Sequence, residues 1–181
     1  MSFPRISANH KSSTCTGGGT GFLIREPFTQ LPSSFPNFSS FEVSSLALTL
    51  PQSKVSFFNI YRQPHLHLLF SKPFSCFLDE FTSFLSTAAT TPHEFLLTGD
   101  FNLHLVNTTD HFTSQFLSVL SSFNLTQHVD FPTHNKRHIL DLVITSSDST
   151  LAPSLTTTGS LNRVPALAGV KAGMSPLPGG R

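Results

Sequence analysis

The sequence is poor in the residues that usually define a site or a surface. It has no tryptophan, one tyrosine and two cysteines, and only 12% of its 181 residues are charged. Cys15 and Cys76 form no C-x-x-C pair, which argues against a zinc site or a disulfide framework and predicts two free thiols. Lys and Arg number 11 against 10 Asp and Glu, a net charge of +1. Charge alone therefore does not predict tight binding to nucleic acid, which usually requires a basic surface.

Long hydrophobic runs and targeting segments are also lacking. No stretch approaches the roughly 20 apolar residues of a membrane span, and residues 1–16 lack the apolar core of a signal peptide. We therefore expect an intracellular protein, nuclear or cytoplasmic, that does not contact a membrane. The three N-x-[ST] sequons, at Asn37, Asn107 and Asn124, would matter only in a secreted protein, and we assign them no role.

What the chain has in quantity is phenylalanine, with 19 residues. Apolar residues recur every three or four positions from Phe74 to Leu85 and from Phe112 to Phe123. This spacing predicts two amphipathic helices, the second with Asp110 as its N-cap. Apolar, β-branched and aromatic runs predict strands at residues 22–25, 41–50, 55–61, 94–98 and 139–145. A turn at 51–54 would join the second and third as a hairpin, or these are two neighbouring strands. Strands interleaved with helices indicate an α/β layered fold.

The predicted elements form one domain, residues 17–155. Residues 1–16 show no strand pattern, residues 27–40 are rich in proline and serine, and Ser, Thr, Pro and Gly dominate the chain after Ser146. We expect a disordered N-terminal segment at 1–16, a loop at 27–40 and a disordered tail at 156–181.

Five short motifs in a fixed order give the most specific signal. They are Gly18–Ile24 (GGTGFLI), Ile60–Pro64 (IYRQP), Phe95–His104 (FLLTGDFNLH), Phe123–His134 (FNLTQHVDFPTH) and His138–Ile144 (HILDLVI). Together they resemble the endonuclease/exonuclease/phosphatase domain, of the apurinic-endonuclease type, of LINE-type non-LTR retrotransposons. The resemblance covers about residues 17–155 and implies a four-layered α/β sandwich, two sheets flanked by helices. We expect a partial sandwich that lacks the first strands and the closing strand.

The resemblance implies Mg²⁺-dependent cleavage of DNA, with DNA as partner and no small-molecule cofactor. In the family, the Asp of G-D-F-N prepares the attacking water and its Asn binds the phosphate; these are Asp100 and Asn102 here. At the end of a strand, residues two apart point to one side, which suits a joint role. Tyr61 matches a tyrosine that contacts the phosphate, and Asp141 matches a carboxylate that orients a catalytic histidine. The oligomeric state stays open.

The sequence also departs from the family pattern. The histidine that Asp141 should orient belongs to an S-D-H motif, and the nearest equivalent, Ser147–Ser149 (SDS), has serine in its place. The early Asn and the metal-binding Glu should precede Gly17, where no Glu occurs. We therefore assign no metal ligand and expect Mg²⁺ not to bind tightly. Arg137 stands where many relatives have glycine.

These departures leave two interpretations open. In the first, the chain is a nuclease domain truncated at both ends, which nicks DNA through Asp100, Asn102 and Tyr61 if a partner chain completes the site. In the second, it is a non-catalytic retroelement remnant or a scaffold. We expect this copy to be inactive, although the sequence does not decide whether it is an enzyme. The pairs His65 with His67 and His134 with His138 lack a Cys or Glu to complete a metal site, and we interpret them as surface or turn histidines.

Overall fold

The described part of the chain forms nine strands and two helices. The structure is a computed structural model that describes residues 6–12, 19–25, 29–31, 35–49, 53–63, 73–103, 105, 110–134, 137–149, 151 and 170–172. Cys15, His65, His67 and Asn107 lie outside these residues, while Cys76 is a free thiol as predicted. No helix of the described residues is long and apolar enough to cross a membrane.

A six-stranded sheet forms the centre of the molecule, in the order β3-β4-β5-β6-β8-β7. Strands β5 and β6 are parallel, and every other neighbouring pair is antiparallel. The strands are β3 (Thr29–Leu31), β4 (Glu42–Thr49), β5 (Lys54–Tyr61), β6 (Glu94–Asp100), β7 (Leu125–Gln127) and β8 (Asp141–Ser146). The predicted hairpin is confirmed as β4 and β5, and the predicted strands at 94–98 and 139–145 are confirmed as β6 and β8, with bounds that shift by one or two residues.

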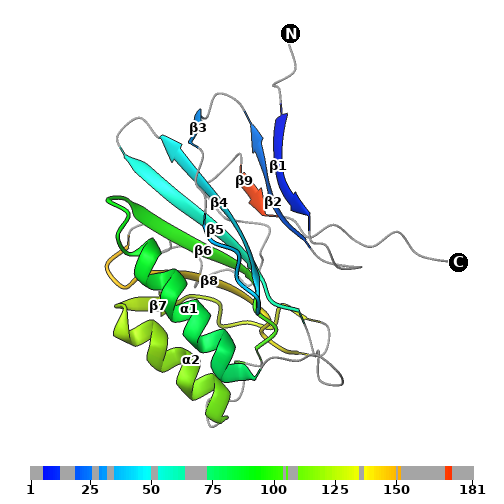
Figure 1. Ribbon diagram of the computed structural model, residues 1–181, viewed down its shortest axis with the longest axis vertical. Helices are drawn as coiled ribbons and strands as arrows, with labels where there is room; N and C mark the ends of the chain where they lie inside the picture. Colours follow the sequence, from blue (N-terminus) through cyan, green and yellow to red (C-terminus); the bar gives the residue numbers. More distant parts are fainter. Residues whose placement is uncertain are drawn as a thin grey trace, which may run out of the picture.

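Helices α1 (Phe74–Ala88) and α2 (His111–Ser122) cover one face of this sheet (Figure 1). Helix α1 connects the parallel strands β5 and β6, as a parallel pair requires. Its predicted apolar stripe is buried through Phe77, Phe81 and Phe84, which pack with β5, β6 and β8 in one core cluster. The predicted N-cap of α2 is also confirmed, since the Asp110 carboxylate accepts a hydrogen bond from the Thr113 N–H at 3.1 Å.

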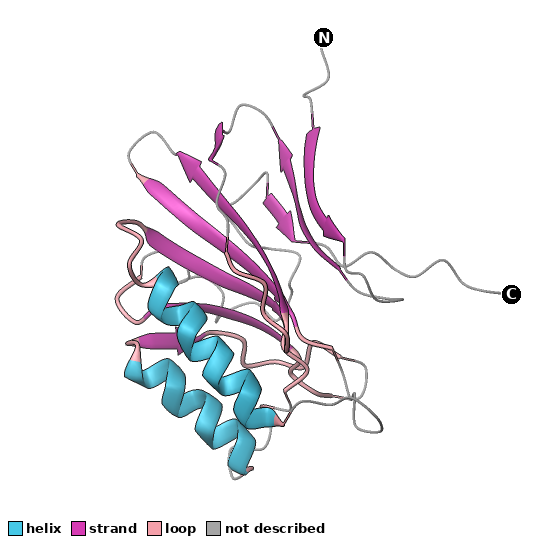
Figure 2. Ribbon diagram, in the orientation of Figure 1, coloured by secondary structure: helices cyan, strands magenta, loops and turns pink. Residues whose placement is uncertain are grey.

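A second, three-stranded sheet lies on the other face of the central sheet (Figure 2). Its order is β1-β2-β9, from β1 (Ile6–Ser12), β2 (Gly19–Arg25) and β9 (Val170–Ala172), and both pairs are antiparallel. Phe22 and Ile24 of β2 pack against Leu46 and Phe57 in a separate core cluster. The described residues thus form three layers, helices, large sheet and small sheet, in agreement with a partial α/β sandwich.

Three short strands correct the sequence analysis. Residues 1–16 and 156–181 were expected to be disordered, yet β1 and β9 form within them, and β3 forms within the expected loop at 27–40. The segment of β1 is largely polar, so its sequence shows no apolar alternation that would predict a strand. Its strand state comes from pairing with β2 over its whole length, from Ile6 with Arg25 to Ser12 with Gly19. Such non-local pairing overrides local propensity in sheets.

Candidate active site

Four polar side chains stand in one row across four neighbouring strands of the large sheet. Glu42 of β4 pairs with Tyr61 of β5, Tyr61 pairs with Asp100 of β6, and Asp100 pairs with Asp141 of β8. Directly paired residues point to the same face of a sheet. All four side chains are half-buried. We call this set the carboxylate row.

The carboxylate row lies on the face that meets the small sheet. Side chains alternate along β5, and Val55 and Phe57, which share a face with Tyr61, belong to the core between the two sheets. Toward the row this face becomes polar: Ser44 donates to the carbonyl of Thr20 at 2.9 Å, and Asn59 donates to the carbonyl of Gly21 at 3.5 Å. Along this face, an apolar core is therefore followed by hydrogen bonds between the two sheets, and the carboxylate row lies at the end of the strands.

The turn that follows β6 needs a glycine before Asp100. Gly99 has a φ of 139°, and a Cβ added there would lie 1.8 Å from the carbonyl oxygen of Ile60. Past Asp100, Phe101 is fully buried, and its N–H donates to the carbonyl of Leu140 at 2.9 Å. The carboxylate of Asp100 accepts from the N–H of Asn102 at 3.0 Å. The close packing of Gly99 on β5 and the hydrogen bonds of Phe101 and Asn102 thus fix the direction of the Asp100 side chain.

The side chain of Asn102, the predicted phosphate ligand, forms a hydrogen bond with the protein backbone. Its φ of 48° is left-handed, and its side-chain amide donates to the carbonyl of Arg62 at 2.6 Å. Asp100 and Asn102 are therefore in contact through a tight turn, and not as two side chains on one strand face. The phosphate contact of Asn102 stays a prediction.

Burial and neighbouring negative charges raise the pKa of two groups in the row. Burial raises the pKa of Asp100, and the nearby Asp141 raises it further, while hydrogen bonds from Asn102 and the neighbouring His134 act in the opposite direction. Burial also raises the pKa of Tyr61, followed by the charges of Asp100 and Glu42. Like charges in a partly desolvated row favour the protonated forms. The phenol of Tyr61 is thus held as a hydrogen-bond donor, and Asp100 becomes a better proton acceptor than an exposed aspartate.

The P-T-H motif ties the loop before β8 to the row. The hydroxyl of Thr133 accepts hydrogen bonds from the N–H groups of Leu140 and Asp141, each at 3.0 Å. His134 and His138 lie in the turn of this loop, with ring centroids 6.3 Å apart. Arg137 has a φ of 61°, a left-handed conformation that glycine adopts more readily than other residues. This loop fixes the start of β8 and brings His134 near Asp100.

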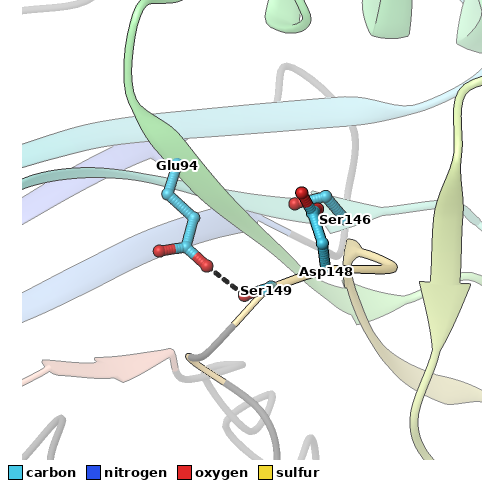
Figure 3. A pocket seen from close by; sticks show the side chains of 4 residues that line it. All are labelled: Glu94, Ser146, Asp148 and Ser149. Carbon is cyan, nitrogen blue, oxygen red and sulfur yellow. Dashed lines mark hydrogen bonds between the residues drawn. The ribbon is translucent and has the colours of Figure 1, made fainter.

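The S-D-S segment, considered above as an equivalent of the missing S-D-H motif, lies at the opposite end of the sheet. A hollow of about 310 Å³ there is lined by Glu94, Ser146, Asp148 and Ser149, and the hydroxyl of Ser149 donates to Glu94 (Figure 3). Glu94 begins β6 and Asp100 ends it, so the two ends are about 20 Å apart at the usual rise of a strand. Asp148 is therefore not positioned to act with Asp141.

Three residues near the site were missed in the sequence analysis: Glu42, Arg62 and His134. Glu42 could have been found from the predicted hairpin, because pairing Thr49 with Lys54 across the turn sets Glu42 opposite Tyr61. His134 was noticed only as a turn histidine. Arg62 acts through contacts to backbone atoms, which leave no pattern in a sequence.

The resemblance also implies a magnesium site. Mg²⁺ prefers carboxylate oxygens and water, at close to octahedral geometry. Within the described ranges, no group of three or more His, Cys, Asp and Glu side chains is close enough to hold a metal ion. The described residues alone therefore do not fit such a site.

Comparisons with known proteins identify the family and the fold. Residues 55–161 match the family described as endonuclease-reverse transcriptase. The endonuclease domain of TRAS1, a telomere-specific non-LTR retrotransposon, has a similar structure: TM-score 0.58, 13% identity, covering 85% of this chain and 74% of that one. This likeness confirms the predicted fold. No curated protein matches the sequence.

Two further solved structures are less similar, and no conclusion rests on them. An endonuclease/exonuclease/phosphatase family protein from Leptotrichia buccalis C-1013-b has a TM-score of 0.39 at 10% identity, covering 78% of this chain and 49% of that one. The cytolethal distending toxin of Haemophilus ducreyi has a TM-score of 0.34 at 17% identity, covering 80% and 61%. The family match spans more than half of the chain and includes Tyr61, Asp100, Asn102 and Asp141. The chain belongs to the endonuclease-reverse transcriptase family.

Proposed function

We propose that this domain binds a DNA phosphodiester at the carboxylate row and hydrolyses it slowly. The observation that carries the proposal is the alignment of Tyr61, Asp100 and Asp141 on three adjacent strands. In-line attack needs a group that accepts a proton from water and donors for the phosphate oxygens. Asp100, with its raised pKa, suits the first role, and the protonated phenol of Tyr61 suits the second.

The rate should be low because the S-D-H histidine expected to protonate the leaving group has no counterpart in the Ser147–Ser149 (SDS) segment. In the family resembled, Asp141 would orient this histidine, whereas Ser149 stands in its place here, at the far end of the sheet. General acid catalysis usually contributes about 10²–10⁴-fold. Slow nicking, rather than rapid cleavage, is therefore the expected activity.

The second candidate is a non-catalytic retroelement remnant or a scaffold without an enzymatic role. The observation that favours it is the hydrogen bond from the Asn102 side chain to the carbonyl of Arg62. A phosphate would have to compete with this bond for the amide group. Under this alternative, the carboxylate row has no catalytic consequence.

Nicking of supercoiled plasmid decides between the two. The full chain, Asp100→Asn and Asp148→Asn would be incubated with Mg²⁺, and each again with EDTA. Asp148→Asn is the matched control, because it removes an exposed carboxylate at the far end of the sheet. We expect nicking by the wild type and the control, and a loss of about 100-fold or more in Asp100→Asn. Equal activity in the wild type and Asp100→Asn, including none in either, would refute catalysis at the row.

A further inference from the structure

Arg62 follows Tyr61 at the end of β5, and its backbone belongs to the turn beyond β6. Its N–H donates to the carbonyl of Asp100 at 2.9 Å, and its own carbonyl accepts from Nδ2 of Asn102 at 2.6 Å. The first bond continues the backbone pairing of β5 and β6 beyond the last strand pair, Tyr61 with Asp100, and the second joins the Asn102 side chain to the same residue. The backbone of Arg62 thus holds both ends of the Asp100–Asn102 turn.

The guanidinium of Arg62 binds the same turn. Its Nη1 donates to the carbonyls of Phe101 and Asn102, each at 3.3 Å. Because Asn102 is left-handed, the chain leaves the sheet here, and its carbonyls need partners other than a neighbouring strand. A planar guanidinium with five donors can serve two carbonyls at once, which a lysine ammonium does less well.

Two aromatic rings hold the guanidinium in place. Its central carbon lies 5.0 Å from the ring centroid of Phe77 and 5.6 Å from that of Phe74, both in the first turn of α1. At these distances a cation is attracted to a ring face. The side chain is therefore wedged between the start of α1 and the turn after β6, which restricts its motion.

We propose that Arg62 is a positioning residue of the carboxylate row. By closing the Asp100–Asn102 turn, it keeps the N–H of Asn102 within 3.0 Å of the Asp100 carboxylate and so fixes that carboxylate beside Tyr61 and Asp141. This role in catalysis rests on the proposed function. The geometry can nevertheless be measured without any turnover.

Removing the side chain should raise the pKa of Asp100. The hydrogen bond from Asn102 favours the charged carboxylate, whereas burial and Asp141 favour the protonated one. The other groups that face Asp100 are Tyr61 on β5 and His134 in the loop before β8, with Glu42 next along the row. None of these is altered in an Arg62 variant. Without the hydrogen bond from Asn102, burial and Asp141 would therefore raise the pKa of Asp100 further.

The test is an NMR titration of the Asp100 carboxyl carbon in the full-length wild type, Arg62→Met, Arg62→Lys and Lys54→Met. Lys54 is exposed at the start of β5, so Lys54→Met removes one positive charge without touching the turn. We expect the titration to move upward in both Arg62 variants and to stay unchanged in Lys54→Met. An unchanged titration in Arg62→Met, or full recovery of the wild-type titration in Arg62→Lys, overturns the proposal. If Arg62→Met does not fold, the lysine variant alone decides.

Plasmid nicking separates this proposal from the proposed function. Where the wild type nicks, Arg62→Lys should nick about tenfold or more slowly at an unchanged apparent affinity for DNA. Equal rates in the two proteins would refute the positioning role. Where the wild type does not nick, the proposed function fails, and the Asp100 titration still decides what Arg62 does.

Discussion

The two ends of β6 both carry carboxylates and hydroxyl groups, but they are built in different ways. At the Asp100 end, the carboxylate row runs across paired strands. The N–H of Asn102 binds the Asp100 carboxylate, and the carbonyl of Leu140 accepts from the N–H of Phe101 in the turn that follows. At the Glu94 end, the carboxylate is bound by the hydroxyl of Ser149, from the turn after β8, beside an open hollow (Figure 3).

The difference shows that acidic residues alone do not indicate a site. A carboxylate fixed by backbone hydrogen bonds keeps one geometry, which chemistry requires, whereas one bound by a single side chain can rotate away. Only the Asp100 end combines fixed geometry with shifted pKa values in the described residues. Three further predictions test this comparison.

Gly99→Ala should have the largest effect, because it breaks the Asp100 end. The added Cβ would clash with the carbonyl of Ile60, and a φ of 139° is strained for alanine. We expect the free energy of unfolding to fall by about 3 kcal/mol or more, measured by urea denaturation. Ser86→Ala, on the exposed face of α1, is the control and should change it by about 0.5 kcal/mol or less. A small effect of Gly99→Ala would show that β6 can move away from β5.

The dependence of stability on pH should be the next largest effect. Because the folded-state pKa of Asp100 is raised, the folded chain keeps a proton that the unfolded chain loses near pH 4. The resulting stabilisation is complete below the unfolded pKa and is lost as the pH rises through the folded pKa. Asp141→Asn removes the neighbouring charge, so it should weaken this loss.

Urea midpoints between about pH 3 and pH 7 would measure this dependence. Asp148→Asn removes a carboxylate from the far end of the sheet and should follow the wild type in parallel. If the curves of Asp141→Asn and the wild type are also parallel, Asp141 does not act on Asp100.

Ser149→Ala should have the smallest effect. The hydroxyl of Ser149 donates to Glu94 and accepts from the N–H of Leu151 at 3.0 Å. At an open site, water can replace both bonds, so we expect a cost of about 1 kcal/mol or less. Nicking should not change. A loss of nicking would mean that the two ends of β6 are coupled.

Much of the fold could be predicted from local patterns, but the site could not. The period of Phe77, Phe81 and Phe84 predicts α1 because one helix face is buried, and Asp110 predicts the start of α2 because its side chain caps it. By contrast, β1 is formed only by pairing with β2, and no local signal marks it. Helix signals lie in neighbouring residues, whereas strand pairing joins distant ones.

The site residues were predicted only as far as the family resemblance reached. Tyr61, Asp100, Asn102 and Asp141 were all found from motifs, and the structure brings them to one end of the large sheet. The motifs did not show that Asn102 is bonded to the carbonyl of Arg62, since such a contact depends on the left-handed turn. Nor did they include Glu42, which depends on how β4 is aligned with β5.

The alignment of β4 with β5 has an evolutionary consequence. Glu42 faces the small sheet because four residues connect Thr49 to Lys54. An insertion or deletion of one residue that slid β4 along β5 would turn Glu42 toward the helices, without any substitution, and would leave Tyr61, Asp100 and Asp141 in place. Among homologues, the length of this connection should therefore vary together with the presence of an acidic residue at position 42.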